Sequence, residues 1–531
     1  MAIHQSHKIA FSSLVSVLPR WVKFLLAALL VLSCGKEKKP LQQQILAQVG
    51  KRVITAAEFT YSYEFSFAPL RQGPNPRRAY LDYMVNELLL ANEGYRLGYH
   101  QSHYVRSRVA HRRRNDLLEA FYLNHVHRKV TVPEEALQEA IKKGTVKWRM
   151  IIWPTASLEE AQKAQAEARK TNLEDFIARK TADEERSTKA KRQFESDWID
   201  YLDLQPEAFA HIKDLQIGQV SDPIPYGSGY AVVQIKDINR EGIREPELEA
   251  GAKRKQMYIR LYDIEADRIV HNLMDSIMTP LNVRVKGSVV EAIAPALYEW
   301  VKDGLPETSL LQAVKNAPDS AKEYLKVLNK YKHQTLLTFQ NGSKTVQDYL
   351  AYMNYYRSPL KQSRSYDDFK QRLITEIGTQ LKNERFVDIA EQEGFADSTQ
   401  IVDDLRLWEQ KWTYDVYRAE SVKDLTVSDQ EMHDFFKTRW RELGIADIDS
   451  TRLYKYENQV YNFILHEKQS QRLQQRLAEL EKRYPVRINE PLLNELKLSD
   501  SVKTNWTSFF VRKNFTGQAL VPIVDMKWLR F

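Results

Sequence analysis

The segment Ile45-Leu-Ala-Gln-Val-Gly-Lys-Arg-Val-Ile-Thr-Ala-Ala-Glu-Phe59 decides how this 531-residue chain begins to fold. Two short β-prone runs flank Gly50, which predicts a hairpin. Thr55 and Glu58 stand three residues apart, the spacing of a capping box at the start of a helix. Residues 78–98 follow with apolar positions at helical spacing. The sequence therefore predicts a small hairpin that leads into a set of helices.

The second half of the chain repeats this pattern. The segment Thr335-Leu-Leu-Thr-Phe-Gln-Asn-Gly-Ser-Lys-Thr-Val-Gln-Asp-Tyr349 matches the first hairpin, with Thr345 and Asp348 in the capping positions. A glycine suited to a helix C-cap follows in both halves, at Gly98 and Gly394. Two further landmarks match in order and spacing: Thr131–Leu137 with Thr426–Met432, and Leu281–Val285 with Tyr484–Ile488. These matches predict a duplicated helical unit.

The two halves differ at one insertion of roughly residues 145–240, where the second half has only about ten residues. The predicted fold class is α+β multidomain, with mostly helical, duplicated units and one inserted small α/β domain. The expected division is signal peptide 1–33, tether 34–44, N-terminal helical unit 45–144, inserted domain 145–240, returning helix and strand 241–290, linker helices 291–330, second helical unit 331–490 and β-prone tail 491–531.

The N-terminal leader predicts export. Residues 1–33 carry three basic residues and no acidic one, and end in the apolar run 24–32. That run is too short to cross a bilayer, which takes about 20 residues in a helix, and is typical of a secretory signal. Val31-Leu-Ser-Cys34 resembles a bacterial lipobox, and Cys34 is the only cysteine. We therefore expect Cys34 to be acylated, with an ordinary cleaved signal and an incidental cysteine as the alternative.

Charge and motifs exclude several classes of function. Without residues 1–33 the chain has a small positive excess, which does not indicate a nucleic-acid partner. The sequence has no glycine-rich phosphate loop, no His-Glu-x-x-His and no Gly-x-Ser-x-Gly. We expect no metal and no small-molecule cofactor. His111, His125 and His127 accompany Arg112–Arg114, which indicates a solvated basic face, and the acids of residues 403–409 are interpreted as helix-surface residues.

The order of parts resembles the periplasmic chaperones of the SurA/PrsA type, which join a helical chaperone segment to a parvulin-like peptidyl-prolyl isomerase domain. Residues 45–137 resemble the helical segment. Four stretches resemble the isomerase domain: Lys147–Ile152 its first strand, Leu204–Phe209 its pocket segment, Leu215–Ile224 a characteristic turn, and Gly229–Ile235 its last strand. The resemblance implies that the inserted domain is parvulin-like, of the PpiC type, and that the partners are unfolded polypeptides.

The sequence departs from the family at its site. Met150 and Ala231 stand where the family has two histidines that face each other beneath the pocket, and neither side chain can form their hydrogen-bond network. The resemblance implies a proline pocket made of Met150, Asp183, Trp198, Leu204, Phe209 and Ala231. The alternative is that the apolar members of this set only fill the core of a small domain. No residue is assigned a catalytic role.

These features predict a membrane-anchored chaperone or foldase on the periplasmic side of the cell envelope. It would bind unfolded exported or outer-membrane proteins and would meet the membrane through the lipid on Cys34. Two alternatives stay open, an active peptidyl-prolyl isomerase and a structural envelope lipoprotein that acts as a scaffold. The tail, whose residues 505–513 and 519–528 are β-prone and aromatic, is expected to pack on the second unit or, less favourably, to pair with a partner strand.

Overall fold

The computed structural model describes most of the chain. The described residues are 40, 43–181, 194–227, 229–241, 247–353, 358–445, 449, 451–498 and 521–530. The predicted signal peptide, Cys34 and Asp183 lie outside them. The chain divides into unit 1, which joins the residues up to Glu119 with those from Ala390 onward, and unit 2, Ala120–Ile389. Within the described ranges, no helix has both the length and the apolarity needed to cross a bilayer.

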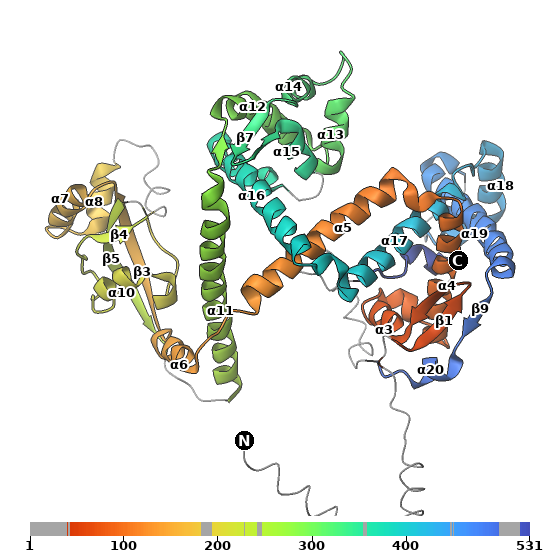
Figure 1. Ribbon diagram of the computed structural model, residues 1–531, viewed down its shortest axis with the longest axis horizontal. Helices are drawn as coiled ribbons and strands as arrows, with labels where there is room; N and C mark the ends of the chain where they lie inside the picture. The colour runs from red at the N-terminus through yellow and green to blue at the C-terminus, as the bar shows by residue number, and fades with distance from the viewer. Residues whose placement is uncertain are drawn as a thin grey trace, which may run out of the picture. The chain divides into compact units, whose positions relative to one another are not determined.

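Unit 1 combines the first and the last parts of the chain, drawn in red to orange and in blue in Figure 1. Its elements are β1 Ile45–Val49, β2 Arg52–Thr55, α3 Ala56–Glu64, η2 Ala68–Arg71, α4 Pro76–Arg96, η3 Tyr99–Gln101, most of α5 His103–Tyr122, η8 Phe395–Asp397, α17 Thr399–Glu420, α18 Asp429–Arg439, η9 Trp440–Leu443, η10 Leu453–Lys455, α19 Glu457–Arg483, β9 Val486–Ile488, α20 Glu490–Glu495 and η13 Met526–Arg530.

Unit 2 contains the inserted domain and the second hairpin. Its elements are η4 Leu123–His127, α6 Glu134–Lys143, β3 Val146–Thr155, α7 Leu158–Ala168, α8 Leu173–Lys180, η5 Tyr201–Asp203, α10 Pro206–Ile212, β4 Ile224–Tyr226, β5 Gly229–Arg240, α11 Glu247–Met278, η6 Thr279–Leu281, β6 Arg284–Val285, α12 Gly287–Asp303, α13 Glu307–Lys315, α14 Glu323–Tyr331, β7 Thr335–Phe339, β8 Gly342–Thr345, α15 Val346–Met353, η7 Pro359–Gln362 and most of α16 Tyr366–Gln392.

The predicted start of both helical units is confirmed. Thr55 Oγ1 accepts from the backbone N–H of Glu58 at 3.1 Å, and the Glu58 carboxylate accepts from the N–H of Thr55 at 2.9 Å. Thr345 and Asp348 make the same reciprocal bonds. Gly98 and Gly394 both adopt the left-handed conformation, at φ of 82° and 80°, where glycine avoids the strain of a Cβ. The elements of both units confirm the mostly helical α+β fold class, and the duplication stays a prediction.

The two hairpins exchange their third strands. β9, which closes the second half of the chain, pairs antiparallel with β1 of the first half. β6, which closes the first half, pairs antiparallel with β7 of the second half. The flanking bonds are equivalent, because Asn489 N–H donates to the Leu46 carbonyl and Lys286 N–H to the Leu336 carbonyl, both at 2.8 Å. Each small sheet therefore needs residues from both halves of the sequence.

Each unit has its own apolar core. In unit 1, Phe59, Tyr80 and Leu89 from the first half pack with Tyr414 and Leu477 from the second half. α4 and α17 approach so closely that a Cβ on Gly94 would lie 2.8 Å from Thr413 Cγ2. Unit 2 has a separate core built around Trp300 of α12, with helices α13 to α16 and the β6–β7–β8 sheet.

The expectation of a solvated basic face on α5 is wrong for one of its arginines. Arg112 is 4% exposed, and its guanidinium donates two bonds to the carboxylate of Asp404 at 2.5 and 2.9 Å. Arg112 also lies 3.2 Å from Asp116. Asp404 is therefore half of a partly buried ion pair between α5 and α17, whereas Arg113 pairs with Glu391 at the surface.

Candidate functional site

The inserted domain is a sheet of three strands in the order β3-β5-β4, covered by helices on both faces. Side chains alternate along β3, so that Trp148 and Met150 lie on one face and Ile151 and Trp153 on the other. Helix α10 covers the first face, and helices α7 and α8 cover the second. The site predicted from the sequence lies on the first face.

Four of the predicted pocket residues meet on that face. Met150 and Ala231 are 1% and 0% exposed and belong to one apolar cluster. Leu204 and Phe209 are half-buried and pack against the same cluster. Phe209 therefore presents part of its ring to solvent above a wholly apolar floor, and we call these four residues the apolar seat.

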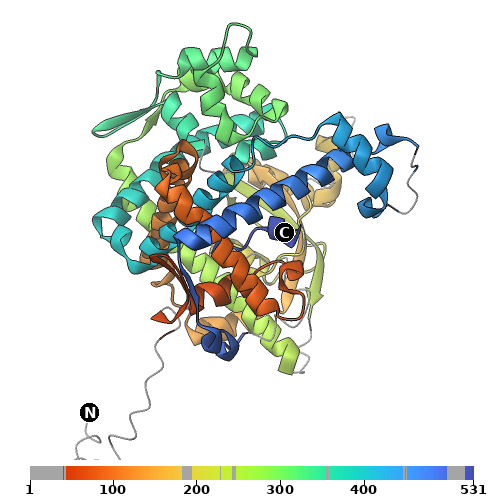
Figure 2. The ribbon, with the colours of Figure 1, turned by 90° about the vertical axis from the view of Figure 1, so that its right-hand side faces the viewer.

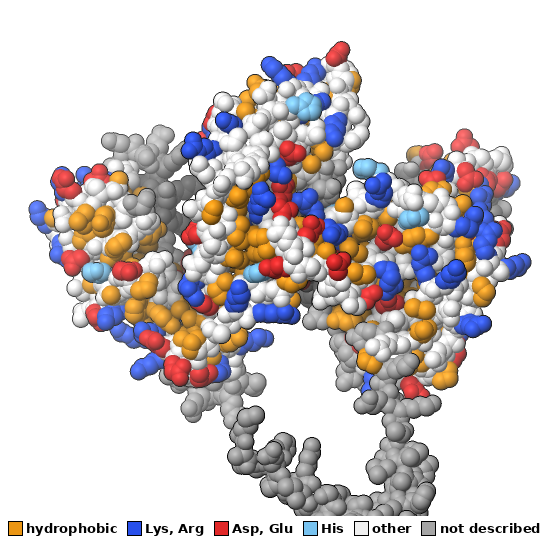
Figure 3. All heavy atoms as spheres, viewed as in Figure 1, with side chains coloured by type: hydrophobic (Ala, Val, Ile, Leu, Met, Phe, Trp, Pro, Cys, Tyr) orange, Lys and Arg blue, Asp and Glu red, His pale blue; other side chains and the backbone are white. Residues whose placement is uncertain are grey.

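The other two predicted pocket residues do not join this cluster. The Trp198 side chain is 43% exposed and lies outside the cluster, so its predicted place in the pocket is not supported by the geometry. Asp183 lies outside the described residues. Orange apolar side chains are visible on this domain at the left of Figure 3. Its exposed large apolar residues include Leu158, Trp198, Ile217 and Tyr226.

Met150 and Ala231 share a face but are not cross-strand partners. In the antiparallel pairing of β3 with β5, Met150 lies opposite Ile235 and Ala231 lies opposite Pro154. Both residues belong to the same apolar cluster, and their place beneath a proline pocket stays a prediction. The backbone N–H of Met150 donates to Ser196 Oγ at 2.9 Å, so the neighbouring polar contact is to the backbone and not to a side chain at position 150.

Three residues that contact the apolar seat were not predicted from the sequence. The Phe209 ring packs edge-on to Trp148 with centroids 6.0 Å apart, and tilted against Tyr201 at 5.8 Å. The ammonium of Lys143, from α6, lies 5.4 Å from the Phe209 centroid and 5.5 Å from that of Tyr201, within cation–π range. Trp148 could have been found from strand alternation, since it stands two residues before Met150.

The polar groups at the rim are held by ion pairs. Asp200 is 3% exposed, caps η5 and pairs with Arg260 of α11, which also donates to Asp203 at 2.9 Å. Burial, together with the charges of Glu139 and Asp200, raises the pKa of Tyr201 to about 12. The Tyr201 hydroxyl is therefore protonated at neutral pH and is able to donate a hydrogen bond.

This arrangement favours binding over acid–base chemistry. Prolyl isomerisation breaks no covalent bond, and its barrier is about 18–20 kcal/mol of lost amide resonance. A catalyst must favour the twisted amide over both planar forms. The seat offers apolar contact and one neutral hydroxyl, while the thioether of Met150 and the methyl of Ala231 donate no hydrogen bond. On the opposite face, a cavity of about 10 Å³ beside Glu195 has room for one water at most.

Comparison with known proteins identifies the inserted domain. Residues 134–250 match the family model of the PPIC-type PPIase domain, a range that adds α6 and the start of α11 to the sheet and its covering helices. The chain therefore contains a parvulin-like domain of the PPIC type, as the sequence resemblance predicted. No curated protein matches the chain.

Solved structures show weaker similarity. The chain is 14% identical to the peptidylprolyl isomerase PrsA of Bacillus anthracis, covering 31% of this chain and 70% of that one, with a TM-score of 0.22. PrsA of Bacillus cereus is 16% identical, with 31% of this chain and 59% of that chain covered and a TM-score of 0.21. A Campylobacter jejuni structure, whose description names the SurA-like chaperones PEB4 and Cj1289, is 12% identical. The match covers 46% of this chain and 100% of that chain, with a TM-score of 0.22. TM-scores this low do not establish a common fold over the whole chain.

Proposed function

We propose that this chain is an extracytoplasmic chaperone, anchored by a lipid on Cys34, that holds unfolded exported polypeptides and binds proline-bearing apolar segments at the apolar seat of its parvulin-like domain. The observation that carries the proposal is the match of residues 134–250 to the PPIC-type domain, combined with the burial of Met150 and Ala231 in an apolar cluster. The apolar seat can contact a peptide without the polar network of the isomerase.

The apolar seat supports binding by contact area. Phe209 and Leu204 are half-buried, so a segment that covers them removes apolar surface from water, at about 25 cal/mol per Å². Such contacts are weak individually and carry little sequence information. They are therefore suited to reversible binding of many different clients.

The anchor rests on the sequence alone. The leader and the Val31–Cys34 stretch favour export and acylation, and acylation by several chains holds a protein at a membrane more firmly than one chain. Labelling the full chain with a radioactive or alkyne-tagged fatty acid in a bacterial host tests this directly. Incorporation that disappears in Cys34→Ser is expected, and incorporation that persists in that variant would contradict the anchor.

The chaperone role is tested with denatured outer-membrane proteins. The purified full chain is expected to delay their aggregation when they are diluted from urea, at ratios near one chaperone per client. Phe209→Ala should weaken the binding of a proline-bearing apolar peptide several-fold, while His211→Ala, an exposed position on the same helix α10, should not. A full chain that leaves aggregation unchanged would refute the proposal.

Active prolyl isomerisation is the second candidate, because the PPIC-type match favours it. A protease-coupled assay on a proline peptide separates the two. We expect no turnover above the uncatalysed rate. Turnover that Phe209→Ala abolishes would show that the domain is a working isomerase.

A further inference from the structure

The C-terminal segment 521–529 lies on unit 1 as if it were a bound peptide. Its first residues form no regular secondary structure, and η13, Met526–Arg530, follows. Figures 1 and 2 both show the C-terminal end against α4. Residues 499–520, which connect the segment to α20, lie outside the described part of the chain. Val524 and Trp528 are 2% and 1% exposed and belong to the core cluster of unit 1.

Unit 1 contacts the backbone of this segment through side chains. Ser62 Oγ donates to the Pro522 carbonyl at 3.3 Å, and Tyr80 Oη accepts from the N–H of Val524 at 3.3 Å. Glu87 accepts from the N–H of Asp525 at 2.8 Å. Bonds from side chains of unit 1 to the main chain of this segment do not depend on the segment's own side chains. They are the contacts that peptide-binding sites use for affinity.

Two side chains of the segment enter apolar sockets four residues apart. The Trp528 ring stacks near Tyr83 and Tyr414, with both centroid distances 6.3 Å, and its Nε1–H donates to Glu87 at 3.1 Å. Val524 occupies the second socket. Between them, Met526 is 39% exposed. The spacing therefore selects an apolar residue followed four positions later by an aromatic one.

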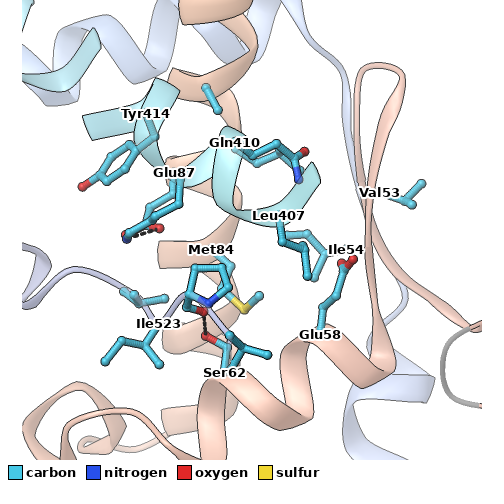
Figure 4. Close-up of a pocket in the computed structure, with 16 residues that line it drawn as sticks. Val53, Ile54, Glu58, Ser62, Met84, Glu87, Leu407, Gln410, Tyr414 and Ile523 are labelled. Carbon is cyan, nitrogen blue, oxygen red and sulfur yellow. Dashed lines mark hydrogen bonds and ion pairs between the residues drawn. The ribbon is translucent and has the colours of Figure 1, made fainter. Parts of the chain in front are cut away.

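Glu87 organises the aromatic socket. Its carboxylate is 13% exposed and receives Lys411 Nζ at 2.7 Å from α17. With this cation in place, one oxygen of Glu87 accepts from both the backbone and the indole of the segment. Figure 4 shows Glu87 and Tyr414 close to each other at one end of the groove and Ser62 farther along it.

The segment does not fill the groove. A cavity of about 90 Å³ remains beside it, lined by Ile54, Met84 and Leu407 of unit 1 and by residues 521–524 of the segment (Figure 4). An engineered cavity of about 150 Å³ holds a benzene molecule, so this space accepts an additional branched aliphatic side chain. A different segment can therefore bind here with more apolar contact than the chain's own C-terminus.

We propose that this groove of unit 1, between α3, α4 and α17, is a peptide-binding site, and that residues 521–529 are its resident ligand. Its other ligands are unfolded segments able to form the same turn, with an aliphatic residue followed four positions later by tryptophan or another large aromatic residue. The identity of those ligands as client segments rests on the proposed chaperone function. The resident segment competes with them at an effective concentration in the millimolar range, as expected for a tethered ligand.

The test uses the purified full chain and a fluorescein-labelled peptide with the sequence of residues 521–529, followed by fluorescence anisotropy. Trp528→Ala should release the resident segment, and the affinity for the labelled peptide should rise at least tenfold over the wild-type chain. The exposed Met526→Ala is the matched control and should bind as the wild-type chain does. A labelled peptide with alanine in place of its tryptophan should bind at least tenfold more weakly to Trp528→Ala.

Trp528→Phe guards against misfolding, because it keeps a ring in the socket and removes only the donor to Glu87. It should raise the affinity several-fold. Equal affinities in wild type, Met526→Ala and the folded Trp528 variants would overturn the inference, and so would binding that ignores the tryptophan of the labelled peptide. A chain that delays aggregation but fails this test retains the proposed function without this site. A chain that passes this test but does not delay aggregation has the site without the function.

Discussion

Replacement of Arg112 by methionine tests how unit 1 is held together. Arg112 is buried and pairs with Asp404 of α17 through two bonds, while Asp116 of its own helix lies 3.2 Å away. Methionine keeps much of the length and apolar stem of arginine but removes the positive charge. The two carboxylates, 9% and 17% exposed, would then lie together without a cation.

The expected loss of stability at pH 7 is about 3–5 kcal/mol, the cost of removing one partner from a buried ion pair. Its size depends on pH. Burial, and the neighbouring charge of Asp404, already raise the pKa of Asp116, while Arg112 lowers it. A raised folded-state pKa means that stability falls as the pH rises above the unfolded value of about 4. Without Arg112 the pKa of Asp116 should rise further, so the loss of stability should be largest at pH 7 and shrink toward pH 5.

Hydrogen exchange at increasing urea concentrations measures this loss of stability, because peptides from α17 report on unit 1 separately from unit 2. Arg113→Met is the matched control, since Arg113 pairs with Glu391 where both side chains are about 40% exposed. Its loss should stay below about 1 kcal/mol, as for other surface ion pairs. Equal deficits for the two variants, or a deficit for Arg112→Met that does not decrease at pH 5, would refute the reasoning.

Three further predictions follow from the packing and the site. Gly94→Ala should destabilise unit 1 by about 1–2 kcal/mol in urea unfolding, because the new methyl group meets Thr413. Gly378→Ala, where a Cβ meets nothing within 4 Å, should instead stabilise α16 by up to about 1 kcal/mol, and the same sign for both would contradict this account. Thr55→Ala should cost about 1 kcal/mol in thermal unfolding through loss of the cap, whereas an unchanged midpoint would show that the cap contributes nothing. The double variant Met150→His/Ala231→His should gain no prolyl isomerisation in a protease-coupled assay, because the two positions are not cross-strand partners; a clear gain would show that reasoning to be wrong.

The local parts of the fold could be predicted from the sequence because short-range chemistry determines them. The reciprocal bonds of Thr55 with Glu58, and the left-handed Gly98, depend on residues within one turn. The exchange of β6 and β9 could not be predicted, because either hairpin offers the same edge to either strand. Only the packing of whole units selects between the two pairings.

The charged run on α5 shows a second limit. Successive helical residues point about 100° apart, so three neighbouring arginines cannot share one face. Arg112 lies on the buried face and Arg113 on the exposed one. The run of arginines predicted a basic surface because the local sequence does not show that Arg112 has an acidic partner. That partner is Asp404, which lies nearly 300 positions away in the sequence.

The candidate site was predicted from the sequence only in part. Met150, Leu204, Phe209 and Ala231 meet on one face, as expected from the resemblance. Lys143 was missed, since its position over Phe209 depends on how α6 lies against the sheet.

The exchanged strands also constrain how the chain is made. Unit 2 is one continuous stretch, so all of its residues are present before unit 1 is complete. Unit 1 cannot complete its fold until the end of the chain has been made. β1 lacks its second neighbouring strand until β9 is present, and Arg77 donates to the carbonyl of Leu493, 416 residues later. During that interval an open sheet edge and half of an apolar core lack their partners and are prone to aggregation. The residues made first therefore find their strand and core partners last, which makes the first half of the chain the part most exposed to misfolding during synthesis.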